Sequence, residues 1–213
     1  MKKLLIFDLD GTLLDTLDDL RNSVNYALKL YNYPERTLEQ IRNSVGNGFA
    51  RLVSTSLPEG AADGEAVLKT ARGHYAEHFC VETKPYDGIL LLLAQLKAEG
   101  HRLAIVSNKP DEMLQSLYHR FFSELVEYAA GEIAGIPRKP QPDPVYGAMA
   151  YFGAEKQDTV YIGDSEVDYQ TSINSGVKPI IVGWGFRRES ELRAAGVDRI
   201  CADMNQLYDM ICE

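Results

Sequence analysis

The sequence predicts an α/β fold, a doubly wound, Rossmann-like parallel sheet that carries an inserted all-helical cap. From about residue 83 onward, short apolar strands alternate with helices, and this alternation requires parallel pairing with helices on both faces of the sheet. Residues 15–82, by contrast, contain helical patterns and no strand of their own. We therefore expect an α/β core of residues 1–14 and 83–213, with a helical cap of residues 15–82 inserted after the first strand.

The first strand is expected at residues 4–7, an apolar run that is followed by Asp8, Asp10 and Gly11. A buried strand that delivers two carboxylates into a crevice has this pattern, because the glycine lets the backbone turn sharply. An ordinary Asp-Gly turn at the end of a strand has it too. The stretch alone leaves both interpretations open.

Capping residues and helix breakers predict the elements of the cap. Thr37 and Gln40 form a capping-box pattern, Gly46 and Gly48 interrupt the helix that follows, and Asp63 can cap a later one. The expected cap helices cover residues 15–31, 38–45, 49–57 and 63–79.

The core repeats one unit several times. Asp87 is expected to cap its first helix, and Gly100 to end it. The expected strands cover residues 102–106, 125–129, 159–162, 179–182 and 199–201, and the expected helices cover 88–99, a stretch from 110, a stretch ending at 152, 166–174, 189–195 and 204–211.

Composition limits the classes of partner. The net charge of −9, with no basic cluster longer than Arg187-Arg188, argues against nucleic acid. Asp8 and Asp10 cut the N-terminal apolar stretch before a signal peptide could form, and the leucines at 90–93 are too few to cross a membrane. We expect a cytoplasmic protein with no membrane partner and no obligate protein partner. Its cysteines, Cys80, Cys201 and Cys212, have neither disulfide nor metal-site spacing.

Polar residues gather at the expected carboxyl ends of three strands. These residues are Asp8 and Asp10 after the first strand, Ser107, Asn108 and Lys109 after the second, and Asp164 and Asp168 after the strand at 159–162. Ligands bind outside the carboxyl ends of strands in such sheets, so we expect one site there, with Lys139 in a nearby loop. A local turn would explain one such cluster but not three.

Four stretches resemble, in order, the motifs of the haloacid dehalogenase-like hydrolases. They are residues 8–12 (DLDGT), Ser107-Asn108, Lys139-Pro140 and residues 163–168 (GDSEVD). The likeness extends over essentially the whole chain, and a helical insert directly after the first motif is similar to the phosphoglycolate phosphatase and β-phosphoglucomutase branch. The resemblance implies a Mg²⁺-dependent phosphatase with an aspartyl-phosphate intermediate, acting on phosphoglycolate or a similar small organic phosphate ester.

The resemblance and the chemistry of the residues assign the same roles. Asp8 is the expected nucleophile and Asp10 the general acid and base, since a like charge nearby raises the proton affinity of Asp10. Mg²⁺ is expected on Asp8, Asp164 and the carbonyl of Asp10, with Asp168 as a further ligand or a support. Two like charges ~4 Å apart cost about 4 kcal/mol at an effective dielectric of about 20, so the cation and Lys139 must neutralise the carboxylates around a phosphate.

Phosphate and substrate contacts are expected from other residues. Ser107 and the backbone amide of Asn108 can hold phosphate oxygens, and the resemblance adds Leu9 to this set. Lys109 stays outside the expected catalytic set. In the cap, Gly46, Asn47 and Gly48 are similar to a substrate-facing loop, although a plain turn between helices has the same composition. Arg51 is either an anion clamp for a substrate carboxylate or a solvated helix residue.

Other functions remain open at this stage. His74, Glu77 and His78 match the H-x-x-E-H pattern of a zinc hydrolase, although no third ligand is apparent. Sugar-phosphate mutase and pyrophosphatase activities are alternatives within the family. A non-catalytic binding module would have lost acidic or basic residues that this chain retains. Residues 183–186 resemble a loop of the phosphoglycolate phosphatase branch, and packing under the cap is their simplest role.

Overall fold

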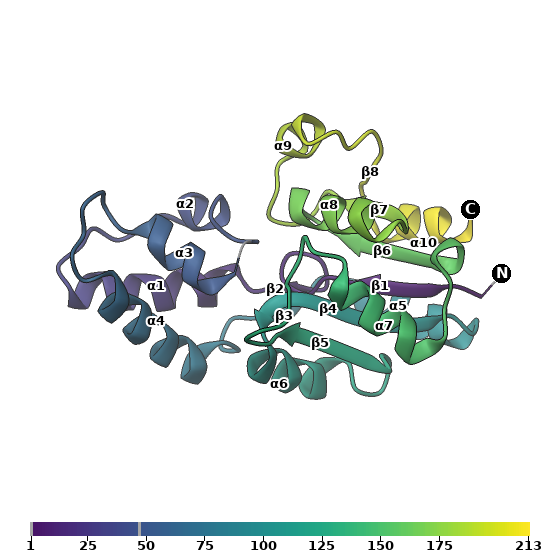
Figure 1. The fold of residues 1–213 in the computed structure, drawn as a ribbon, viewed down its shortest axis with the longest axis horizontal. Coiled ribbons are helices and arrows are strands. Elements are labelled where there is room, and N and C mark those ends of the chain that lie inside the picture. Colours follow the sequence, from purple (N-terminus) through teal and green to yellow (C-terminus); the bar gives the residue numbers. More distant parts are fainter. Residues whose placement is uncertain (1, 47) are drawn as a thin grey trace.

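The computed structural model describes residues 2–46 and 48–213 and contains a six-stranded sheet beside a group of helices (Figure 1). The strands run in the order β5-β4-β1-β6-β7-β8, and every pair between neighbours is parallel. Their bounds are β1 Leu4–Phe7, β4 Arg102–Pro110, β5 Tyr128–Glu132, β6 Thr159–Gly163, β7 Lys178–Val182 and β8 Ile200–Cys201. The expected doubly wound α/β fold is confirmed.

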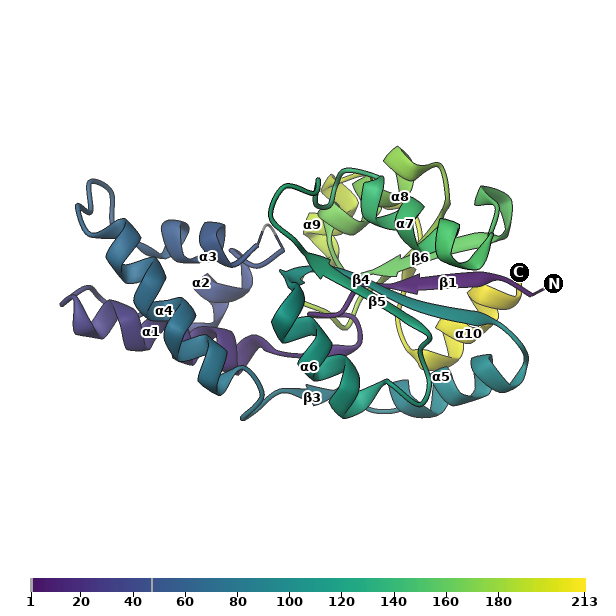
Figure 2. The same cartoon turned by 60° about the horizontal axis from the view of Figure 1, so that its bottom comes forward.

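Helices cover both faces of the sheet (Figure 2). Alternate residues of a strand point to opposite faces, so Leu5 and Phe7 of β1 pack with the helices on one face, while Leu4 and Ile6 pack with those on the other. One face carries α5 Ile89–Ala98, α6 Asp111–Phe121 and α10 Met204–Cys212, and the other carries α7 Asp143–Phe152, α8 Glu166–Ser175 and α9 Glu189–Ala194. Burial on both faces explains why the strands are continuous apolar runs.

The remaining helices form the cap, which lies beside the carboxyl ends of the strands (Figure 1). They are α1 Leu17–Leu30, α2 Leu38–Arg42, α3 Phe49–Ser56 and α4 Gly64–His78. Their apolar residues form a separate core, which also receives Phe186 from the loop after β7. The chain enters and leaves the cap through two short antiparallel strands, β2 Leu14–Asp15 and β3 Lys84–Pro85. The boundary expected between residues 14 and 15 lies inside β2, and the one expected between 82 and 83 lies just before β3.

Several element boundaries differ from the expectations. The strand expected at 125–129 is β5 at Tyr128–Glu132. The amides of Leu125 and Val126 donate to the carbonyl of Phe122 in a turn, so pairing with β4 begins only at Tyr128. Asp87 does not cap α5, which begins at Ile89 and has Gly88, in a left-handed conformation, at its N-cap position. The short strands β2 and β3 were not expected, since two residues carry no periodic pattern. The capping box of Thr37 and Gln40 is confirmed, but α2 ends at Arg42.

None of the described helices combines the length and apolar character that crossing a membrane requires.

A buried carboxylate of the cap is hydrogen-bonded to the return linker, residues 81–83, through which the chain leaves the cap. Asp19 of α1 is only 2% exposed and accepts hydrogen bonds from the backbone amides of Val81 (3.0 Å), Glu82 (3.0 Å) and Thr83 (2.9 Å), and from the Thr83 hydroxyl (2.8 Å). The start of α1 and the return linker are therefore one hydrogen-bonded unit.

We expect Asp19→Ala to lower the free energy of unfolding by about 2–4 kcal/mol, because it leaves several buried amides without an acceptor. The measurement is urea denaturation followed by circular dichroism. Asp18→Ala is the matched control, since Asp18 is half-exposed and its ion pair with Arg21 is a surface pair worth about 0–1 kcal/mol. Equal losses in the two variants would contradict the anchoring role of Asp19.

Candidate active site

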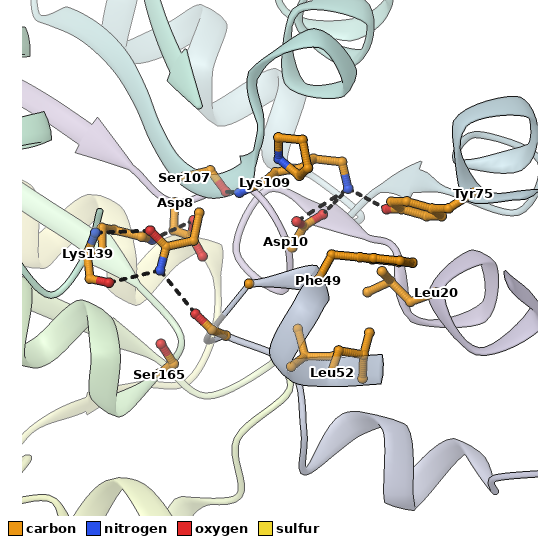
Figure 3. Close-up of a pocket in the computed structure, with 15 residues that line it drawn as sticks. Asp8, Asp10, Leu20, Phe49, Leu52, Tyr75, Ser107, Lys109, Lys139 and Ser165 are labelled. Atoms are coloured by element: carbon orange, nitrogen blue, oxygen red, sulfur yellow. Dashed lines mark hydrogen bonds and ion pairs between the residues drawn. The ribbon is translucent and has the colours of Figure 1, made fainter. Parts of the chain in front are cut away.

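The carboxyl ends of β1, β4 and β6 meet at one cavity of about 50 Å³ between the sheet and the cap (Figure 3). The core lines it with Asp8, Asp10, Ser107, Asn108, Lys109, Pro110, Lys139 and Ser165, and the cap with Leu20, Val45, Gly46, Gly48, Phe49, Leu52 and Tyr75. The floor of the cavity is therefore polar and charged, whereas its roof is largely apolar. Polar strand ends that are far apart in sequence come together here because parallel strands all finish at the same edge.

Lys139 neutralises two of the carboxylates. Its ammonium group is buried and lies 2.8 Å from Asp8 Oδ1 and 2.7 Å from Asp168 Oδ1. Burial alone would lower the pKa of Lys139, but Asp168 and Asp8 hold it well above its ordinary value. Asn108 fixes the backbone of this lysine, since its side chain accepts from the Lys139 amide and donates to the Lys139 carbonyl, both at 3.0 Å.

Asp8, Asp164 and Asp168 form the acidic centre of the site. Each offers an oxygen within 4.8 Å of the other two, and all three side chains are buried. Burial raises the pKa of Asp8 to about 7, with Asp168 and Asp10 adding to the rise and Lys139 opposing it. Burial, followed by the charges of Asp168 and Asp8, raises the pKa of Asp164 well above its ordinary value. A divalent cation with a preference for oxygen ligands fits this set, because it would supply the missing positive charge.

Asp168 is occupied by hydrogen bonds to the protein. One carboxylate oxygen accepts from Lys139 and from the Tyr161 hydroxyl, and the other accepts from the Ser165 hydroxyl at 2.6 Å and from two backbone amides. Ser165 and Asp168 also form the capping box of α8. These bonds hold Lys139 and the turn that carries Asp164, so the geometry favours Asp168 as a support of the site rather than a ligand.

Asp164 itself is held from two sides. Its carboxylate accepts from the Thr12 hydroxyl at 3.2 Å and from the backbone amide of Phe186 at 2.7 Å. Gly11 has a φ of +91°, and a Cβ there would lie 2.4 Å from Asp164. The turn after Asp10 therefore needs glycine both for its conformation and for this close approach.

Asp10 has a buried partner that the sequence did not assign. The Lys109 ammonium lies 3.0 Å from Asp10 Oδ1 and also donates to the hydroxyl of Tyr75 on cap helix α4. Burial would lower the pKa of Lys109, but Asp10 and Tyr75 raise it above its ordinary value. Burial raises the pKa of Tyr75 to about 12, so its phenol stays neutral. The strand-end position of Lys109 was a usable signal for its role, whereas Tyr75 looked like any apolar position of a helix.

The cap residues singled out by sequence are divided. The Gly46 carbonyl accepts from the Asn108 side chain at 3.2 Å, and Gly48 has a φ of +82° at the start of α3. Asn47 lies outside the described residues. Arg51 is exposed and is not among the residues that line the cavity, which α3 meets through Phe49 and Leu52. Its position does not support an anion clamp.

The remaining residues from the sequence lie as follows. Ser107 lines the cavity, and its hydroxyl accepts from the Lys109 amide at 3.2 Å. The Leu9 side chain is fully buried in the core, so only its backbone could meet a phosphate. His74, Glu77 and His78 do not form a metal-binding group, because among the described residues only Asp8, Asp164 and Asp168 bring such side chains together. The His78 ring instead bonds the carbonyl of His74.

Comparison with known proteins gives a consistent picture. A family model described as haloacid dehalogenase-like hydrolase matches residues 5–182. The chain is 29% identical to the phosphoglycolate phosphatase of Haemophilus influenzae over 98% of both chains, and 30% identical to the pyrophosphatase PpaX of Halalkalibacterium halodurans over 97% of this chain and 95% of the relative. A crystal structure from Lactobacillus delbrueckii superposes with a TM-score of 0.92 at 36% identity, covering 99% of both chains.

We expect Mg²⁺ to raise the melting temperature of the metal-free protein, and to do so more at pH 8 than at pH 5. The pKa of Asp8 is about 7 in the folded protein against 3.8 ordinarily, so the folded state holds its proton more tightly and loses stability as pH rises through this window. A cation offsets that loss. Thermal unfolding with and without Mg²⁺ measures the shift.

Asp164→Asn should remove most of this Mg²⁺-dependent shift, whereas Asp209→Asn, on the exposed surface of α10, should retain it. An undiminished shift in Asp164→Asn would show that the cation binds elsewhere.

Proposed function

Because the chain belongs to the haloacid dehalogenase-like hydrolase family, we propose that it is a phosphatase that hydrolyses a small organic phosphate ester through a phosphorylated Asp8. The observation that carries the proposal is the placement of Asp8 and Asp10 at the end of β1, in one cavity with Lys139 and beside Asp164. A carboxylate nucleophile, a second acid close to it and a buried cation are the groups that phosphoryl transfer requires.

In the first step, an oxygen of the Asp8 carboxylate attacks phosphorus and the bond from phosphorus to the ester oxygen breaks. Asp10 donates a proton to the departing alkoxide, which leaves as an alcohol. In the second step, Asp10 takes a proton from water as the water attacks the same phosphorus, and the bond from phosphorus to Asp8 breaks. The products are the alcohol and inorganic phosphate, and both acids return to their starting states.

The neighbours of these acids keep them in place and balance charge. Lys139, 2.8 Å from Asp8, is positioned to neutralise charge on the transferring phosphoryl group. Ser107 and the backbone amides of Leu9 and Asn108 are the proposed phosphate contacts. Asp8, Asp164 and the backbone carbonyl of Asp10 would hold Mg²⁺, which when bound neutralises the acidic cluster and polarises the phosphate oxygens. Asp168 supports this set by holding Lys139 and the turn at Asp164.

The size and lining of the cavity support a small substrate. About 50 Å³ remains between core and cap, and the cap contributes mainly apolar groups, among them Leu20, Phe49 and Leu52. Lys109, which pairs with Asp10, is one of the two lysines among the described residues that line this cavity, and it would attract a carboxylate on the leaving group. Phosphoglycolate combines small size with a carboxylate. Relatives that are 29% and 30% identical to this chain are named phosphoglycolate phosphatase. Residues 15–82 would then act as the cap that selects the leaving group.

Pyrophosphate is the second candidate substrate, because a relative that is 30% identical over nearly the whole chain is named pyrophosphatase PpaX. The chemistry at Asp8 would be unchanged, and only the leaving group would differ. A sugar-phosphate mutase would instead pass the phosphoryl group of Asp8 back to a sugar rather than to water. Release of inorganic phosphate separates the hydrolases from the mutase.

The test of the function is phosphate release from a panel of phosphoglycolate, pyrophosphate, sugar phosphates and an aryl phosphate in Mg²⁺. We expect phosphoglycolate to have the highest kcat/KM, and Asp8→Asn to lose at least about three orders of magnitude of turnover on every substrate, because an amide is not a nucleophile toward phosphorus. Normal aryl phosphate hydrolysis by Asp8→Asn would rule out the proposed intermediate.

Lys109→Met should lower kcat about tenfold or more, because Asp10 loses the cation that holds its carboxylate. Tyr75→Phe keeps the pair of Lys109 and Asp10 and removes only one hydrogen bond, so its kcat should fall about threefold or less. Steady-state kinetics on the best substrate of the panel measures both. An unchanged kcat in Lys109→Met would contradict the positioning of Asp10 by this lysine.

A further inference from the structure

Arg187 links the core to the cap through a buried guanidinium. It follows β7 in the segment 183–187 and is only 7% exposed. Its Nε and Nη2 donate to the two carboxylate oxygens of Glu166, the first residue of α8, at 2.6 and 3.1 Å. The same guanidinium donates to the cap carbonyls of Val45 at 2.6 Å and Arg42 at 3.1 Å. These two carbonyls lie at the end of α2 and in the turn after it, which leads directly into Gly46.

Phe186 makes a second connection from the same segment. Its side chain is 4% exposed and packs in the apolar core of the cap rather than in the core of the sheet. Its backbone amide donates to Asp164 Oδ2 at 2.7 Å. One residue therefore contacts the acidic centre through its main chain and the cap through its side chain.

The backbone around these two residues allows little freedom. A Cβ at Gly185 would lie 2.3 Å from the Asp164 Cβ and 2.5 Å from the Gly11 carbonyl oxygen, so the segment runs tightly against the first and fourth motifs. Trp184 donates its indole N–H to the carbonyl of Thr12 at 3.2 Å. The segment is thus fixed to the core on one side and reaches the cap on the other.

We propose that Phe186 and Arg187 are positioning residues, a latch built on the core that holds the turn at Val45 and Gly46 over the cavity and so sets the fit of the leaving group. The inference rests on the proposed function for its kinetic consequence. Gly46 connects the latch to the site, because its carbonyl is bonded by Asn108 and it lines the cavity. Neither latch side chain touches the reacting atoms, so the effect must come through the position of the cap.

Arginine is required at this position by geometry. A planar guanidinium can bond both oxygens of Glu166 and two carbonyls at once, whereas a lysine ammonium cannot reach this arrangement of acceptors. The neighbouring Arg188 also contacts the cap, through an ion pair with Glu39 of α2, but the side chains of both partners are exposed. An exposed pair contributes little to the position of either partner. The two adjacent arginines therefore both link the core to the cap, Arg187 through buried contacts and Arg188 through an exposed ion pair that serves as a control.

The test compares Arg187→Ala and Arg187→Lys with Glu39→Gln, which removes only the charge of Glu39 from the exposed ion pair. We expect Arg187→Ala to raise KM for phosphoglycolate about tenfold and Arg187→Lys to raise it about threefold, while competitive inhibition by inorganic phosphate in Mg²⁺ changes less than about twofold in both. The difference arises because the core alone holds the phosphate. Glu39→Gln should match the wild type.

Hydrogen exchange gives a readout that needs no activity. Amides of α2 and α3 should exchange about tenfold faster or more in Arg187→Ala, with β1 and β6 unchanged. If the wild type releases no phosphate from any ester, the proposed function fails, and faster exchange in the cap still supports the latch. Unchanged exchange in α2 and α3, or parallel changes in KM and in phosphate inhibition, would overturn the latch. Arg187→Lys retains the charge, so the same comparison holds if Arg187→Ala does not fold.

Discussion

The structure depends on the close packing of acidic side chains at one edge of a parallel sheet. Asp8, Asp10, Asp164 and Asp168 all converge there, and an isolated buried carboxylate is too costly to remain ionised. Two buried lysines offset part of this negative charge. Lys139 pairs with Asp8 and Asp168, and Lys109 pairs with Asp10. The pKa values of Asp8 and Asp164 are nevertheless raised, because the two lysines do not offset all of the negative charge. A divalent cation fits this site because it would offset the rest.

The cap is attached to the core by a few contacts. In the proposed mechanism the phosphoryl group contacts only the core, which leaves the cap to select the leaving group and to exclude water. Its attachments combine buried polar contacts with the packing of Phe186 in the apolar core of the cap. Asp19 joins α1 to the return linker, Tyr75 reaches Lys109, and Arg187 binds carbonyls before Gly46. Tyr75 and Lys109 line the cavity, and so does Val45, whose carbonyl Arg187 bonds, so these two contacts connect the position of the cap physically with the arrangement of the acids.

The segment after β7 illustrates how one stretch serves several needs. Gly185 lies so close to Asp164 and Gly11 that a residue with a Cβ would not fit. Trp184 donates a hydrogen bond to the first motif, and Phe186 and Arg187 contact the cap. From sequence it resembled a family loop with no role beyond packing. Phe186 does pack with the cap, and the polar bonds of the segment to Asp164 and to the cap carbonyls are added to that packing.

The sequence by itself determined the fold class and the membership of the acidic cluster. Apolar runs alternating with helices imply a parallel sheet, and polar residues after three runs must then meet, because parallel strands end at one edge. Only the tertiary structure decided which lysine pairs with which acid, that Asp168 is surrounded by hydrogen bonds to the protein, that Arg51 is exposed and does not line the cavity, and that Tyr75 and Arg187 connect the cap to the core. These depend on how the cap packs against the core, and no local spacing encodes a contact such as that of Arg187 with the Arg42 carbonyl, between residues 145 positions apart.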